Sequence, residues 1–125
     1  MEKIKFRRLD HIQICIPKGK EDEARKFYTG ILGLKELPKP AELIPNGGLW
    51  YKIAGIQLHI GTEDETSKTK RHPAFEIENI IKVKKYLEEK GITIKEEIQI
   101  PGQKRFSFYD PFSNRIELLE KTDNR

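Results

Sequence analysis

The sequence predicts one domain of the α+β class, built from two copies of a strand–helix–three-strand (βαβββ) unit. Three observations lead to this prediction: the order of strand and helix patterns repeats, each helix pattern ends at a glycine, and apolar residues alternate in the strand segments. The chain of 125 residues has the usual length of a single domain. We expect the first unit to span residues 7–62 and the second unit residues 70–121.

The first unit is expected to contain one helix at about residues 21–32. Apolar side chains recur there at intervals of three and four residues, which places them on one helical face. Gly33 follows, and glycine readily adopts the left-handed conformation that ends many helices. Strand patterns lie before this helix at residues 9–16 and after it at residues 34–37, 48–53 and 56–60.

The second unit repeats this order, with a helix at about residues 80–90 that ends at Gly91. Residues 61–71, between the two units, are polar and charged, which is typical of an exposed connector. The strand patterns of the second unit lie at residues 72–77, 92–98, 104–109 and 115–119.

All three histidines of the chain, together with one glutamate, lie on the polar faces of predicted strands. Successive strand residues point to opposite sides of a sheet, and the alternate residues of these four strands are apolar and can pack under the helices. The polar residues are His11, His59, His72 and Glu117. His11 and His59 are 48 residues apart, and His72 and Glu117 are 45 apart, so the two pairs occupy equivalent places in the repeat.

Neutral imidazoles and a carboxylate together suit one divalent ion of zinc, iron, manganese, nickel or cobalt. Taken singly, a strand histidine is more often a hydrogen-bonded structural residue, and a glutamate near a C-terminal strand is usually just solvated. The repeated spacing favours the metal site. We therefore predict one metal ion held by His11, His59, His72 and Glu117, with a net charge of about +1 that favours an anionic ligand.

Three further residues are candidates for binding a substrate. Arg105, beside Lys104, can make paired hydrogen bonds to a carboxylate or phosphate, and its neighbour Phe108 is the aromatic candidate. The alternative for this segment is a solvated rim. Trp50 alternates with Tyr51 in a short strand, so Trp50 lines either the cavity or the ordinary core.

Composition and charge limit the partners and the cellular location that we expect for this chain. The net charge is +4 and the basic residues are scattered, with no nucleic-acid-binding module, so we expect a small-molecule partner of anionic character and no nucleic acid. No segment approaches the ~18 apolar residues of a membrane helix, and no membrane partner is expected. The single cysteine, Cys15, cannot form an intrachain disulfide, and we expect a cytoplasmic location.

Four motifs, in this order, resemble those of the vicinal oxygen chelate superfamily, which includes glyoxalases, bleomycin-resistance proteins and extradiol dioxygenases. The resemblance runs from about residue 9 to residue 121. The motifs are residues 10–14 (DHIQI), 27–34 (FYTGILGL), 72–77 (HPAFEI) and 110–118 (DPFSNRIEL).

This resemblance implies a curved, mixed, mostly antiparallel sheet around a central cavity, with the helices on its outer face and metal ligands on the first and last strands of each unit. It also implies a homodimer, because in many small members the cavity is built from one unit of each chain. His11 with His59 would then meet His72 with Glu117 of a partner. Whether the site lies within one chain or between two is left open by the sequence.

The resemblance implies a metal-dependent enzyme that chelates vicinal oxygens of a small metabolite or xenobiotic, as a lyase or isomerase, a thiol transferase or a dioxygenase. Lactoylglutathione lyases have a glutamate, which serves as ligand and base, where this sequence has His59, and this difference counts against that chemistry. Glu117 and His59 are the candidate catalytic residues. Dioxygenases and fosfomycin-modifying transferases use two histidines and a glutamate, which correspond to His11, His72 and Glu117. The alternative is a non-catalytic protein that sequesters an antibiotic or another ligand.

Overall fold

The computed structural model describes residues 3–65 and 67–122, and it contains the duplicated order of elements that the sequence predicts. The first half contains β1 (His11–Pro17), α1 (Glu21–Arg25), the π-helical segment η1 (Lys26–Ile31), β2 (Lys35–Leu37), the 3₁₀ helix η2 (Ala41–Asn46), β3 (Leu49–Ile53) and β4 (Ile56–Glu63). The second half contains β5 (Ala74–Glu76), α2 (Ile80–Glu89), β6 (Lys95–Glu96), β7 (Gln103–Tyr109) and β8 (Arg115–Lys121).

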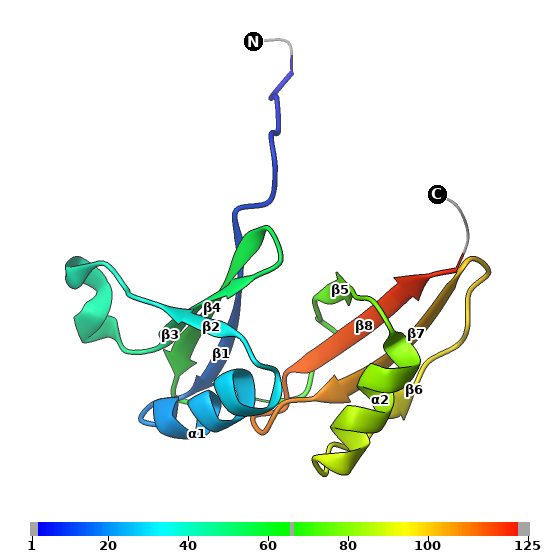
Figure 1. Ribbon diagram of the computed structural model, residues 1–125. Helices are drawn as coiled ribbons and strands as arrows, with labels where there is room; N and C mark the ends of the chain where they lie inside the picture. The colour runs from blue at the N-terminus through cyan, green and yellow to red at the C-terminus, as the bar shows by residue number, and fades with distance from the viewer. Residues whose placement is uncertain (1–2, 66, 123–125) are drawn as a thin grey trace.

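The strands form two four-stranded mixed sheets with the same internal order, β1-β4-β3-β2 and β5-β8-β7-β6. In each sheet the first and last strands of the half pair in parallel, and the other neighbours pair antiparallel. Figure 1 shows the first sheet on the left and the second on the right, with α1 and α2 on the same lower side of the molecule. The predicted α+β class with two βαβββ units is confirmed, and β1 and β5 are edge strands.

The boundaries of several elements differ from the sequence prediction. The first helix is divided into α1 and η1, β4 continues to Glu63 into the expected connector, and η2 was not predicted. The strand expected at residues 92–98 is reduced to β6, because side-chain groups replace the strand ladder beyond it. Arg105 Nε donates to the carbonyl of Ile98 (2.9 Å), and Gln99 Nε2 donates to the carbonyl of Arg105 (3.1 Å).

Both predicted glycine helix ends are confirmed, since Gly33 has φ +72° and Gly91 has φ +83°. These values lie in the left-handed region that glycine adopts without a steric penalty. No helix among residues 3–65 and 67–122 is long and apolar enough to cross a membrane.

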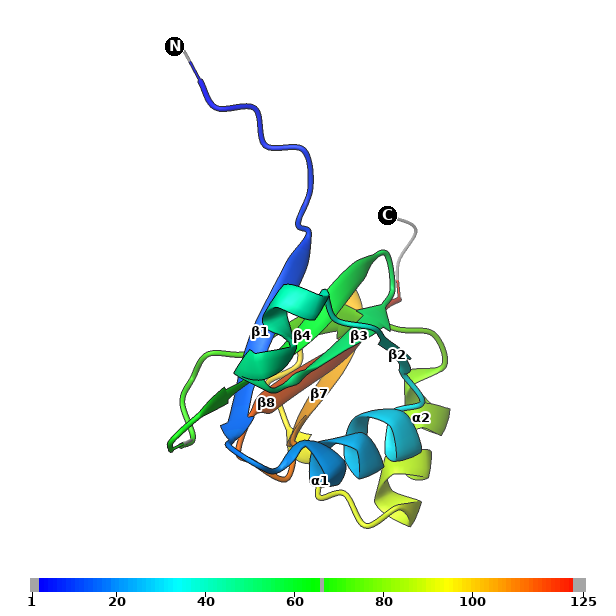
Figure 2. The same ribbon diagram turned by 90° about the vertical axis from the view of Figure 1, so that its left-hand side faces the viewer.

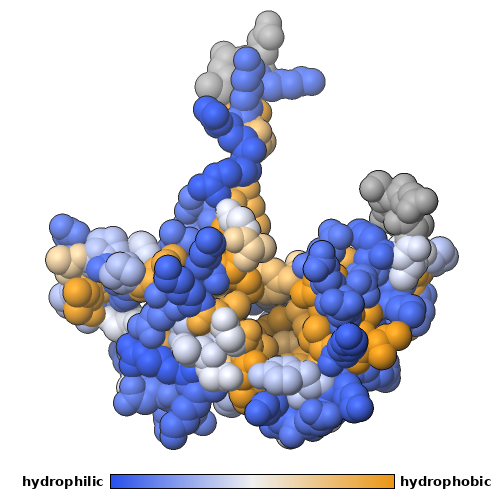
Figure 3. Space-filling view, viewed as in Figure 1, coloured by the Kyte–Doolittle hydropathy of each residue, from blue (hydrophilic) through white to orange (hydrophobic). Residues whose placement is uncertain are grey.

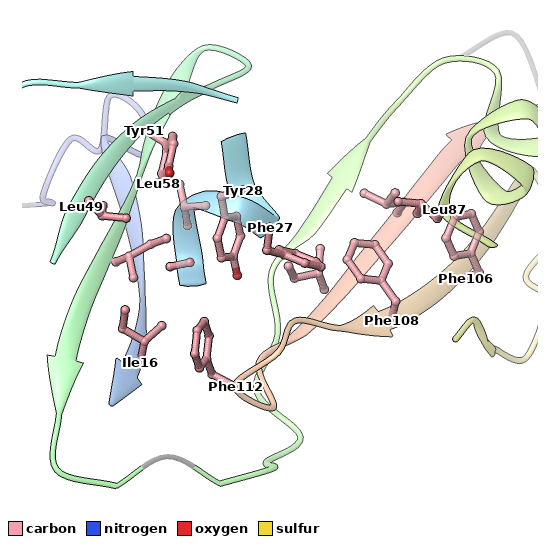
Figure 4. Close-up of a cluster of buried hydrophobic side chains, with 14 of the residues drawn as sticks. Ile16, Phe27, Tyr28, Leu49, Tyr51, Leu58, Leu87, Phe106, Phe108 and Phe112 are labelled. Carbon is pink, nitrogen blue, oxygen red and sulfur yellow. The ribbon is translucent and has the colours of Figure 1, made fainter. Parts of the chain in front are cut away.

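The hydrophobic core is continuous across the two halves. Figure 4 shows the side chains of the first helix lying between the two sheets. Tyr28 packs against Tyr51 of the first sheet (ring centroids 6.0 Å apart), and Phe27 packs against Phe108 of the second (6.2 Å). The segment α1–η1 therefore joins the two sheets through burial of aromatic surface, a major source of stability in a small domain.

The turn between β7 and β8 adds a polar connection inside this core. The Asp110 carboxylate is only 4% exposed and accepts hydrogen bonds from Tyr28 Oη (2.6 Å), Phe112 N, and both the backbone N and Nδ2 of Asn114. Asn114 Nδ2 also donates to the carbonyl of Cys15 at the end of β1 (2.9 Å). Burial, together with the charge of Asp110, holds the pKa of Tyr28 well above its ordinary value.

Tyr28→Phe is expected to lower the free energy of unfolding by about 1.5–3 kcal/mol, because a buried carboxylate loses a hydrogen-bond donor. The control is Tyr86→Phe, since Tyr86 is 40% exposed and its hydroxyl donates to the carbonyl of Ile31 (2.8 Å). That variant should lose less than about 1 kcal/mol. Urea unfolding of both variants measures the difference, and equal losses would contradict the role assigned to Asp110.

Candidate metal centre

The register of the parallel strand pairs brings the predicted ligands together in two pairs. In the first sheet, Gln13 lies opposite His59, so His11, two residues earlier on β1, is a diagonal neighbour of His59. In the second sheet, Ala74 lies opposite Glu117, which makes His72 the diagonal neighbour of Glu117. The same geometry therefore operates in both halves.

The pair in the second sheet brings a nitrogen and an oxygen ligand atom close together. His72 Nε2 lies 3.1 Å from Glu117 Oε1, and Glu117 is 4% exposed. His72 Nδ1 lies 2.9 Å from the carbonyl of Lys70, which only an N–H at Nδ1 can satisfy. With a proton on Nδ1, Nε2 can hold a second proton and form an ion pair with Glu117, or it can present its lone pair to a metal ion. An imidazole nitrogen and a carboxylate oxygen this close together fit a divalent metal ion.

Arg105 contacts the same carboxylate oxygen. Its Nη1 donates to Glu117 Oε1 (3.2 Å), and its side chain is 18% exposed. A buried carboxylate is stable only when it is paired or hydrogen-bonded, and Arg105 provides part of the positive charge. The residue expected to bind an anionic substrate group therefore lies directly beside the predicted ligand Glu117.

The pair in the first sheet is a stack of aromatic rings. His59 lies between Trp50 (centroids 4.0 Å apart, planes at 2°) and His11 (4.1 Å, 18°). His11 Nδ1 lies 2.9 Å from Asp10 Oδ2, an interaction that orients the ring and leaves Nε2 free to bind a metal. His59 Nε2 lies 2.9 Å from Gln57 Oε1.

Burial and the neighbouring His11 lower the pKa of His59, which favours the neutral imidazole that a ligand or a general base requires. Trp50 lies on this polar face, since it pairs with His59 across β3 and β4. With His59 it lines a pocket of about 320 Å³ that also includes Lys39 and Thr62. Of the two places considered for Trp50, a cavity wall and the ordinary core, the structure has the first.

The four predicted ligands do not converge in a single chain. Among residues 3–65 and 67–122, no group of three or more His, Cys, Asp or Glu side chains lies close enough together to hold a metal ion. A cavity of about 550 Å³ lies beside His72 and is also lined by Gln13, Cys15, Arg71 and Arg115. One chain thus contains two candidate half-sites, each made by the first and last strands of its sheet.

Phe108 does not belong to this site, and its assignment as a substrate-binding residue is corrected. It is 0% exposed and packs in the core against Phe27 and Phe106. The register explains why: Ser107 lies opposite Glu117 and shares its face, so Phe108 points to the helix side.

A second buried ion pair on this face of the sheet was missed in the sequence. Glu97 accepts hydrogen bonds from Ser107 Oγ and from a guanidinium nitrogen of Arg115, and its side chain is 8% exposed. The Ser107 hydroxyl, followed by Arg115, lowers the pKa of Glu97 to about 2. Strand parity places Ser107 and Arg115 on the Glu117 face and was a usable signal, whereas Glu97 follows a strand too short to assign.

The fold and these half-sites define a class of protein: two βαβββ units whose first and last strands present imidazole and carboxylate groups on one face. The family model that matches residues 8–118 is the Glyoxalase/Bleomycin resistance protein/Dioxygenase superfamily, and the chain belongs to this family.

Solved structures with this fold include a glyoxalase family protein from Bacillus anthracis, which is 40% identical with a TM-score of 0.90, over 96% of this chain and 99% of that chain. A glyoxalase/dioxygenase from Nostoc punctiforme is 25% identical (TM-score 0.76, 98% and 99% covered). The fosfomycin resistance protein FosX from Listeria monocytogenes is 21% identical (TM-score 0.76, 94% and 93% covered) and shares the fold. The comparison with curated proteins finds no match.

The Glu97 ion pair should make stability depend on acid pH. Because the folded pKa of Glu97 is about 2, below the ordinary 4.5, its contribution is present above pH 4.5 and is lost as pH falls toward 2. The loss should reach about 3 kcal/mol. Urea unfolding at several pH values should show a shallower acid decline in Glu97→Gln than in the unmodified protein.

The control for this measurement is Glu96→Gln, because the Glu96 side chain is 66% exposed. It should keep the acid dependence of the unmodified protein. If the two variants decline equally between pH 5 and pH 2, the buried ion pair has no such role.

Proposed function

We propose that this protein is a metal-dependent enzyme that binds one divalent metal ion through His11, His72 and Glu117. His59 would serve as a fourth ligand or as the ring that orients His11. The observation that carries the proposal is the distance of 3.1 Å between His72 Nε2 and Glu117 Oε1, two atoms of types that bind divalent metals. A structural His–Glu pair would have no need of an equivalent pair of rings at the same register of the first sheet.

The complete site would form between two copies of the chain, with His11 and His59 from one and His72 and Glu117 from the other. Each described chain has the two half-sites on separate sheets. A homodimer would contain two such sites. FosX was solved with Mn(II), so manganese is the first metal to test, followed by zinc, iron, nickel and cobalt.

The substrate we propose is a small oxygen-rich anion. A bound metal would act as a Lewis acid that stabilises negative charge on two neighbouring substrate oxygens. Arg105 would bind the acidic end of the substrate, since a guanidinium pairs well with carboxylate, phosphate or phosphonate. Trp50 would form a wall of the site, and Glu117 or His59 would exchange protons with the substrate. Lyase or isomerase, thiol transferase and dioxygenase reactions all fit this arrangement.

The metal site is tested by replacing one ligand from each half-site. His72→Ala and His11→Ala should each weaken metal binding by at least about 100-fold, since loss of a group that merely supports a ligand already costs 10–100-fold. Elemental analysis and isothermal titration with Mn(II) and Zn(II) measure the change. Glu88→Gln, on the exposed surface of α2, is the control and should bind metal normally.

An unmodified protein that binds no divalent metal would overturn the proposal, as would a His11→Ala variant with unchanged affinity. When metal binds, turnover is sought with catechols, glutathione hemithioacetals and fosfomycin on the metal-loaded protein. The choice among these substrates separates the three reaction types.

A second candidate is a non-catalytic protein that sequesters a planar ligand. The stacked rings of Trp50, His59 and His11 favour it, because stacked aromatic rings offer a rigid apolar surface to another ring. Tight ligand binding that persists in excess chelator, without turnover, would select this alternative.

A further inference from the structure

The first described residues form an exposed arm that precedes β1. Residues 3–10 are all exposed, and both views show them extending away from the two sheets (Figures 1 and 2). Phe6 is 89% exposed, Ile4 66% and Leu9 60%. None of the backbone hydrogen bonds between described residues involves residues 3–9.

Residues 3–7 of the arm have the alternating sequence of a strand, and Arg8 ends the alternation. Apolar Ile4 and Phe6 alternate with basic Lys3, Lys5 and Arg7, and alternation of period two is the pattern of a half-buried strand. The arm continues directly into β1, so the two have the same direction. A lone strand is not stable in water, and this one lacks a pairing partner among the described residues of its own chain.

The edge strand β5 has the complementary surface. It pairs only with β8, so its other edge has free backbone groups. Phe75 and Ile77 face an apolar cleft of about 580 Å³ between the two halves, which Figure 3 shows as a hydrophobic hollow. Glu76 and Glu78 alternate with them, and both are exposed.

We propose that residues 3–10 of one copy add as an antiparallel strand to the free edge of β5 in a second copy. The direction follows from the site proposed above, on which this inference rests: His11 follows the arm and His72 precedes β5, so only the antiparallel arrangement brings them together. With His11 opposite His72, the register is fixed for the whole arm.

This register matches the side chains of residues 5–7 on both faces, and it places Arg8 opposite Phe75. Lys5 lies opposite Glu78 and Arg7 opposite Glu76, so basic residues meet acidic ones, and Phe6 lies opposite Ile77 on the apolar side. Phe6 is an even number of residues from Ile12, so on a continuous strand the two side chains lie on the same face. The Ile12 side chain packs against the core. A shift of one residue would bring Phe6 to the acidic face and Lys5 to the apolar cleft.

The register is tested by cross-linking two different chains. Lys5→Cys and Glu78→Cys are made separately, each with Cys15→Ser, and the two proteins, one of them tagged, are mixed under mild oxidation. A disulfide-linked heterodimer should form at least about 10-fold faster than in a mixture of Lys5→Cys with Glu89→Cys at the end of α2. Equal rates in the two mixtures would overturn the inference.

Two further measurements separate the alternatives. Phe6→Asp should weaken self-association in sedimentation by at least about 10-fold in the presence of chelator, whereas Ile81→Asp, an exposed apolar residue on α2, should not. A chain with both Lys5→Cys and Glu78→Cys that closes a disulfide within the monomer would overturn the intermolecular pairing.

The chelator distinguishes this inference from the proposed function. Cross-linked dimers that bind no metal would uphold the arm and overturn the metal site. Metal-loaded protein without the cross-link would overturn the arm alone.

Discussion

The parallel pairing of the first strand with the last strand of each half is the constraint on which the rest of the structure depends. In β1–β4 and β5–β8 this pairing fixes a register in which Ile and Leu side chains face the helices and polar side chains share the opposite face. A slip of one residue would bury His59 or Glu117 under a helix without a partner. The core and the candidate site are thus two consequences of one register.

Most of the fold follows from local patterns in the sequence. The alternation in β1, β4 and β8 and the glycines after both helices are local properties, so their prediction was reliable. The segment after β6 was different, because the Arg105 side chain of β7 donates to the carbonyl of Ile98 and the Gln99 side chain donates to the carbonyl of Arg105. No local pattern encodes such contacts. The π-helical turn of η1 and the 3₁₀ helix η2 likewise have no periodic signature in the sequence.

The candidate site was predictable as two pairs but not as one centre. Strand parity assigns a face to each histidine and to Glu117, and it would have excluded Phe108 had the pairing of Ser107 with Glu117 been known. Parity contains no information about distance between the sheets. The ring stack of Trp50, His59 and His11 also depends on rotamers, which strand alternation does not determine.

The two half-sites differ in charge. The second-sheet pair contains the carboxylate, held by Arg105 and facing His72, whereas the first-sheet pair contains only rings, with neutral His59 favoured by burial. A carboxylate buried to 4% exposure is stable only when it is paired or hydrogen-bonded. Arg105 supplies one such charge from within the chain. A metal ion between His72 and Glu117 would supply the other, and it would free Arg105 to bind an anion without leaving Glu117 uncompensated.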